Sequence, residues 1–208
     1  MKKILYILLT LVLSTTIIDT QAQDAQSYLD KVVEQFQQAP GITADFTLQG
    51  EAHSGISMKG SIKMQGKKFS ITSNDLTTWY DGKTMWSYAP MIDEVNITTP
   101  TQHELAEINP YIMLDNYKQS FEAKELKSTH KGERQFLLTP TKRNTHIAQV
   151  VLTVATANSA PISFEITDNN NHKILVAITN YNNKVTLPAS TFKFDSAQYP
   201  QVTVIDLR

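Results

Sequence analysis

Hydrophobic residues recur along this chain with two different periods, and the period changes at Pro40 and Gly41. Before that point the apolar side chains fall at helical spacing, at Tyr28, Leu29, Val32, Val33 and Phe36. A Pro-Gly pair commonly ends such a run. The pattern predicts one amphipathic helix over residues 24–39, with a single apolar stripe to bury.

After Gly41 the pattern alternates with a period of two, which is typical of strands. Ile42, Ala44, Phe46 and Leu48 alternate with polar residues. Further runs with strand character follow at residues 56–64, 69–72, 77–80, 84–88, 95–98, 121–127, 135–139, 147–154, 162–167, 174–181 and 191–194. Many short strands separated by Gly, Asn, Asp and Pro predict a mainly β fold, an antiparallel barrel or a strongly curved sheet.

The segment over residues 101–114 interrupts the strands. Residues 102–108 are predicted to form a short helix, and Pro110 then opens an apolar helix or loop, Tyr111, Ile112, Met113 and Leu114. We expect this insert and the N-terminal helix to cover an open end of the barrel.

The first residues have the pattern of a secretory signal peptide. Lys2 and Lys3 precede the apolar run from Ile4 to Leu13, and small residues follow up to Ala22. A membrane anchor is the alternative, but a spanning helix needs about 20 mostly apolar residues and this run is shorter. We therefore predict a signal peptide over residues 1–22, cleaved at or just after Ala22, and a single domain over residues 23–208.

Composition narrows the functional classes. The chain contains no cysteine, which excludes a disulfide framework, thiolate chemistry and acylation of the chain itself on cysteine. The formal net charge is −1, without a long charged run, and this disfavours a nucleic-acid partner. The expected class is a soluble exported protein.

Little in the sequence points to a metal, a cofactor or catalysis. The five histidines stand singly, and His103-Glu104 lacks the second histidine of a zinc-protease helix, because Glu107 occupies that position. Asp93, Glu94 and Asp168 keep a hydrolase open as a minor alternative. The loop at residues 142–144, with Lys142 and Arg143, is either a solvated turn or a docking point for an acidic partner.

An aromatic hairpin is the most distinctive feature, in the stretch WYDGKTMWSYAP over residues 79–90. Asp81-Gly82 predicts a two-residue type I′ turn, with Trp79 and Trp86 on one face of the hairpin. The rings are either ordinary core or part of a ligand surface. Five methionines lie in or near the surrounding strands, and methionine adapts to partners of irregular shape: Met58, Met64, Met85, Met91 and Met113. An apolar, adaptable lining of this kind would suit a lipid.

This hairpin also carries a family resemblance. Residues 81–90, DGKTMWSYAP, resemble the Asp-Gly-Lys-Thr-Leu-Trp-x-Tyr-x-Pro signature of the LolA family of outer-membrane lipoprotein carriers. The similarity extends to Phe46-Thr47, to residues 110–114, to Leu138-Thr139-Pro140 and to the tail from Phe192 to Asp206. The order and spacing of these pieces make the resemblance specific.

The resemblance implies an unclosed antiparallel β-barrel covered by helices, and no catalysed reaction. It implies a monomeric periplasmic carrier that accepts acylated lipoproteins from an inner-membrane ABC transporter and releases them to an outer-membrane acceptor. The alternative is a lipid- or lipoprotein-sensing module of the same fold without carrier activity. The residues expected to line the acyl-chain cavity are Phe46, Leu48, Met58, Met64, Phe69, Trp79, Trp86, Tyr88, Ile112, Met113 and Leu114.

One position departs from the family pattern. The family usually carries an Arg-Pro pair just before the position of Phe69, and its arginine is thought to latch the helical lid. Here the aligned stretch is Met64-Gln65-Gly66-Lys67-Lys68. Gln65 can still donate a hydrogen bond to a lid carbonyl, but the planar five-donor fork of arginine is absent.

Overall fold

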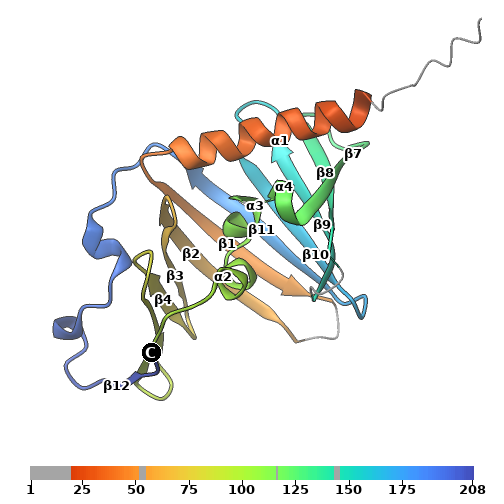
Figure 1. Cartoon of the computed structure of the whole chain (residues 1–208). Helices are drawn as coiled ribbons and strands as arrows, with labels where there is room; N and C mark the ends of the chain where they lie inside the picture. The colour runs from red at the N-terminus through yellow and green to blue at the C-terminus, as the bar shows by residue number, and fades with distance from the viewer. Residues whose placement is uncertain (1–19, 52–54, 116, 143–145) are drawn as a thin grey trace, which may run out of the picture.

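A computed structural model describes residues 20–51, 55–115, 117–142 and 146–208. Its centre is one strongly curved sheet, with helices on one face (Figure 1). Most of the predicted signal peptide lies outside the described residues. No helix within the described ranges is both long enough and apolar enough to cross a membrane.

The sheet has 12 strands in the order β12-β6-β5-β4-β3-β2-β1-β11-β10-β9-β8-β7. Neighbouring strands are antiparallel except β12, which lies parallel to β6. The sheet does not close, since β12 and β7 stand at its two ends, and the predicted mainly β, unclosed barrel is confirmed. The strands are β1 (Ile42–Gly50), β2 (Ser57–Gln65), β3 (Lys68–Ser73), β4 (Thr77–Tyr80), β5 (Met85–Ala89), β6 (Glu94–Thr98), β7 (Phe121–Leu126), β8 (Glu133–Pro140), β9 (Ile147–Ala155), β10 (Pro161–Asp168), β11 (Lys173–Asn182) and β12 (Thr203–Asp206).

Four α-helices accompany the sheet. The long helix α1 (Thr20–Gln38) runs across the ends of several strands in Figure 1, and three short helices lie in front of the curved sheet between β6 and β7. These are α2 (Gln102–Ile108), α3 (Pro110–Asp115) and α4 (Tyr117–Ser120). We call the face of the sheet that these helices cover the helix-side face, and the opposite face the outer face.

Two apolar clusters hold the helices to the sheet. One joins Leu29 of α1 and Leu114 of α3 to Phe136 and Leu152 of the β7–β11 half. The other joins α2 to the β1–β4 half through Leu105, Ile42, Met64, Phe69 and Tyr80. Each such side chain contributes about 1.5–3 kcal/mol when fully buried.

A stacked arrangement fixes the first half of α1. The Tyr28 ring stacks on Phe136 with 5.5 Å between ring centroids, and the Arg134 guanidinium lies 3.9 Å from the Tyr28 centroid. Arg134 also donates to both carboxylate oxygens of Glu125, at 2.7 and 2.6 Å. These bonds hold the pKa of Glu125 below its usual range despite partial burial. The helix is therefore attached to β8 by packing, cation–π contact and a paired charge.

Three local predictions need correction. The helix begins at Thr20 rather than residue 24, so the predicted cleavage point Ala22 lies within α1. Residues 191–194 are not a strand: η1 (Ala189–Phe192) is a 3-10 turn, and the last strand is β12. Another short 3-10 turn, η2 (Ser196–Gln198), lies between them.

The turn after β4 is also longer than predicted. Tyr80 pairs with Met85, which leaves residues 81–84 in the turn. Gly82 has φ of 101°, while the Asp81 side chain accepts hydrogen bonds from the backbone of Lys83 and Thr84 at 3.0 and 2.9 Å. The aspartate therefore closes the turn with its side chain. The predicted pairing of Trp79 and Trp86 on one face is nevertheless confirmed.

Candidate binding pocket

A pocket of about 290 Å³ opens on the helix-side face. It lies between the end of α1, the β2–β3 hairpin, β4 and the helices α2 and α3. Its lining consists of Phe36, Gln37, Gly66, Lys67, Tyr80, Gln102, Leu105 and Ile112. The volume is at the lower end of the range for small-molecule pockets, about 300–1,000 Å³.

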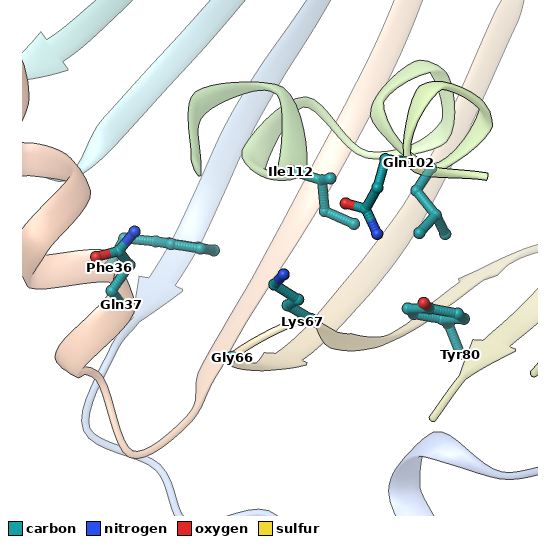
Figure 2. Close-up of a pocket in the computed structure, with 8 residues that line it drawn as sticks. Phe36, Gln37, Gly66, Lys67, Tyr80, Gln102 and Ile112 are labelled. Carbon is teal, nitrogen blue, oxygen red and sulfur yellow. The ribbon is translucent and has the colours of Figure 1, made fainter. Parts of the chain in front are cut away.

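The pocket is apolar inside and polar at its mouth. Phe36, Tyr80, Leu105 and Ile112 supply the apolar walls. Figure 2 shows Gln37 and Gln102 on either side of the opening, with Lys67 rising between them from the hairpin. No carboxylate is among the lining residues. Such a site offers broad apolar contact with a few polar groups at one end.

The strands set the wall on the β-sheet side through cross-strand pairs. Met64 pairs with Phe69, Phe69 with Tyr80, and Tyr80 with Met85, so all four side chains lie on the helix-side face. The Phe69 and Tyr80 rings lie 5.3 Å apart. Burial, and next the charge of Asp81, raise the pKa of Tyr80, which keeps the hydroxyl neutral at the pocket wall.

The helix α2 is held in place at both of its ends. Thr101 and Glu104 form a capping box, in which the Thr101 hydroxyl accepts from the Glu104 backbone at 3.3 Å and the Glu104 carboxylate accepts from the Thr101 backbone at 2.7 Å. At the other end the side chain of Asn109, which is 1% exposed, donates to the sulfur of Met64 at 3.3 Å. Since a thioether is a weak acceptor, this contact between the insert and the sheet is weak.

The helix α4 is bound more firmly to α1. The Tyr117 hydroxyl donates to Asp30 at 2.6 Å, and Lys118 lies 2.8 Å from the same carboxylate. Burial alone would raise the pKa of Asp30, but the hydrogen bonds from Lys118 and Tyr117 hold it below its usual range. The insert is therefore anchored at α4 and lightly held near Asn109.

Gln65 makes a hydrogen bond of the kind expected from the sequence, but with a different partner. Its side chain donates at 3.0 Å to the carbonyl of Pro40, in the turn between α1 and β1. The acceptor is not in the helical insert. Gln65 thus fastens the β2–β3 hairpin to the end of α1, and does not latch α2 or α3.

Eight of the eleven sequence-predicted lining residues lie on the helix-side face or in the helices that cover it. Ile112 lines the pocket. Met64 and Phe69 are buried beside it. Met113 and Leu114 are buried in the other cluster, and Phe46 and Leu48 pack against that cluster. Met58 pairs with Leu48 and shares its face.

The other three residues, Trp79, Trp86 and Tyr88, lie on the outer face. Trp79 packs against Phe194 and Tyr199 of the C-terminal segment, with ring centroids 5.8 and 5.9 Å apart, and Tyr88 lies 4.8 Å from Tyr199. The expectation that these rings share one interior with Phe69 is wrong in its placement. The physical reason is that the C-terminal segment covers this face, so both faces of the hairpin are apolar.

The sequence reasoning missed most of the pocket lining: Phe36, Gln37, Gly66, Lys67, Tyr80, Gln102 and Leu105. Phe36 stands at the end of the predicted apolar stripe of the first helix, and Leu105 is the apolar centre of the predicted short helix. Tyr80 alternates with Trp79, so choosing the other face of the same strand would have found it. The polar rim has no sequence signal of its own.

The carboxylates considered for hydrolysis have roles in turns. Asp93 accepts a hydrogen bond from the Tyr88 hydroxyl at 3.1 Å beside the β5–β6 turn. Asp168 accepts from the backbone of Asn170 and His172, both at 2.8 Å, in the β10–β11 turn. In the described ranges no group of three or more acidic or histidine side chains is placed to hold a metal. The loop at residues 142–144 lies largely outside the described residues.

The fold and the pocket together define a class: an unclosed antiparallel barrel whose apolar interior is covered by helices. A family model described as "Outer membrane lipoprotein carrier protein LolA" matches residues 13–170, most of the chain. The chain belongs to this family. It is 32% identical over 143 residues to an outer-membrane lipoprotein carrier protein of Vibrio campbellii, a match covering 63% of this chain and 64% of that relative.

Solved structures agree on the fold. An uncharacterized conserved protein from Thermus thermophilus superposes with a TM-score of 0.59 at 13% identity, covering 88% of this chain and 99% of that one. A LolA superfamily protein from Nitrosomonas europaea gives a TM-score of 0.45 at 13% identity, covering 82% and 98%. The first likeness supports the architecture; the second is too low to carry an argument.

Proposed function

We propose that this protein carries acylated lipoproteins through the periplasm, with an acyl chain held in the pocket under α2 and α3. The observation that carries the proposal is an apolar, carboxylate-free pocket on the helix-side face of a LolA-family fold. Burying an acyl chain is worth about 0.8 kcal/mol per methylene, so apolar contact alone supplies the affinity. Phe36, Leu105 and Ile112 provide that contact.

The pocket volume implies that the insert moves during loading. About 290 Å³ accommodates part of one acyl chain, whereas a lipoprotein anchor carries more. The contact between Asn109 and Met64 is weak, and the α4 anchor to Asp30 is strong. Pivoting about α4 would therefore widen the pocket at a small cost in free energy. The expected partners are an inner-membrane transporter that loads the chain and an outer-membrane acceptor that receives it.

A fluorescent acyl probe tests the pocket. We expect Ile112→Asn to weaken binding roughly tenfold, because it places an amide without a designed partner among apolar walls. Ile108→Asn is the matched control, since Ile108 is 39% exposed in the same insert and does not line the pocket. Trp86→Phe, on the outer face, should leave the affinity within about twofold.

Two outcomes decide the matter. A folded wild-type protein that binds no acyl probe would refute the proposal. Transfer is then measured as release of lipoproteins from inner-membrane vesicles that contain the transporter. Acyl binding without release would assign the protein to the sensing or binding alternative.

A further inference from the structure

The mouth of the pocket carries one positive charge whose partner lies outside the protein. Lys67 is exposed, it lines the pocket, and no carboxylate of the described chain forms an ion pair with it. The other polar side chains at the rim, Gln37 and Gln102, are neutral. A lysine at the open end of an apolar cavity is complementary to an amphiphile with an anionic group at the end of its chain.

The hairpin fixes the position of this charge. Gln65 pairs with Lys68, so Gly66 and Lys67 form a two-residue loop, and Gly66 has φ of 56°, which suits the first position of such a loop. The bond from Gln65 to Pro40 ties the hairpin to the end of α1. The Lys67 backbone is therefore held close to Phe36 and Gln37, as Figure 2 shows.

The neighbouring lysine has a different environment. Lys68 alternates with Phe69 and so points to the outer face, where its Cγ would lie 3.9 Å from a Cβ added at Gly82. Two adjacent lysines of the same hairpin thus face opposite sides of the sheet. Only Lys67 can meet a ligand in the pocket.

We propose that Lys67 selects acyl ligands that carry a carboxylate within a few bonds of the pocket end of the chain. The proposal rests on the proposed acyl-binding function and deepens it by naming the ligand class. The carboxylate has two sources, a free fatty acid or an acidic residue next to the acyl group of an acylated peptide. The ammonium of Lys67 would donate charge-assisted hydrogen bonds to it, while Gln37 and Gln102 contribute neutral donors.

Two pairs of ligands of equal chain length test the selection. Dodecanoate is compared with dodecanol, and an N-dodecanoyl tripeptide beginning with Asp is compared with its Asn counterpart. Isothermal titration should show that the wild-type protein prefers the carboxylate of a pair by roughly three- to tenfold. The pair that shows the larger preference identifies the source of the carboxylate.

Two variants of equal charge change provide the control. Lys67→Met should abolish the preference for the carboxylate while dodecanol still binds, and Lys68→Met should retain it. Raising the salt concentration should reduce the wild-type preference and leave that of Lys67→Met unchanged. An equal loss in both variants, or none in Lys67→Met, would overturn the assignment. Failure of dodecanol to bind the wild type would instead refute the acyl-binding function itself.

Discussion

Gly60 and Phe46 face each other across β2 and β1, and each explains the other. A Cβ added at Gly60 would lie 2.6 Å from Cζ of the Phe46 ring and would also crowd the backbone oxygen of Thr72. The ring therefore occupies the space that a side chain at position 60 would need. Glycine within a strand often marks such a close approach.

We predict that Gly60→Ala lowers the free energy of unfolding by about 1–3 kcal/mol through overpacking. The cost should be smaller in a Phe46→Leu background, though not abolished, because the crowding with Thr72 persists. Urea denaturation of the two single variants and the double variant measures the coupling. Equal costs in both backgrounds would show that the ring of Phe46 does not set the requirement for glycine.

At the scale of elements, the attachment of α4 to α1 should depend on pH. Tyr117 is 3% exposed, and burial, followed by the hydrogen bond and charge of Asp30, raises the pKa of its hydroxyl above the usual range. A raised folded-state pKa stabilises the protein fully below the ordinary tyrosine value of about 10. That stability is lost as the pH rises further.

The unfolding free energy should therefore fall more between pH 8 and pH 11 in the wild type than in Tyr117→Phe. The variant still loses some stability, because burial also raises the pKa of Tyr80 and, to about 12, that of Tyr181. Urea denaturation at both pH values gives the difference. Parallel losses in the two proteins would show that deprotonation of Tyr117 does not release α4.

Elements were predictable from the sequence where their pairing is local. The strands from β1 to β5 follow one another as hairpins, and period-two alternation with turn residues is sufficient to place them. β12 was not predictable, because it pairs with β6 more than 100 residues earlier in the chain. η1 was mistaken for a strand, because its Thr-Phe composition suits one, and tertiary packing decided otherwise.

The candidate site was harder to predict than the fold, and Trp86 shows why. Alternation separated the two faces of the hairpin correctly, but it gave no means of telling which face the helices cover. In most half-buried hairpins one face is polar and the choice is clear. Here Tyr80 and Met85 lie under the helices, while Trp79 and Trp86 lie under the C-terminal segment.

At the scale of the whole molecule, the C-terminal segment joins distant parts of the sheet. After β11 the chain leaves the middle of the sheet, passes round the outer side of β2–β4 and ends at β12 beside β6 (Figure 1). Phe192 is completely buried on this path, whereas Leu207 near the end is 62% exposed. The segment thus covers the outer face opposite the pocket.

We predict that Phe192→Ala lowers the free energy of unfolding by about 3–5 kcal/mol, since it empties a fully buried aromatic site. Leu207→Ala, in the same segment, should change it by less than about 0.5 kcal/mol. Both tryptophans lie on the outer face, so the fluorescence of folded Phe192→Ala should shift while its affinity for an acyl probe stays close to that of the wild type. A loss of affinity in folded Phe192→Ala would mean that the outer face and the pocket are coupled. Equal stability of the two alanine variants would contradict a structural role for the segment.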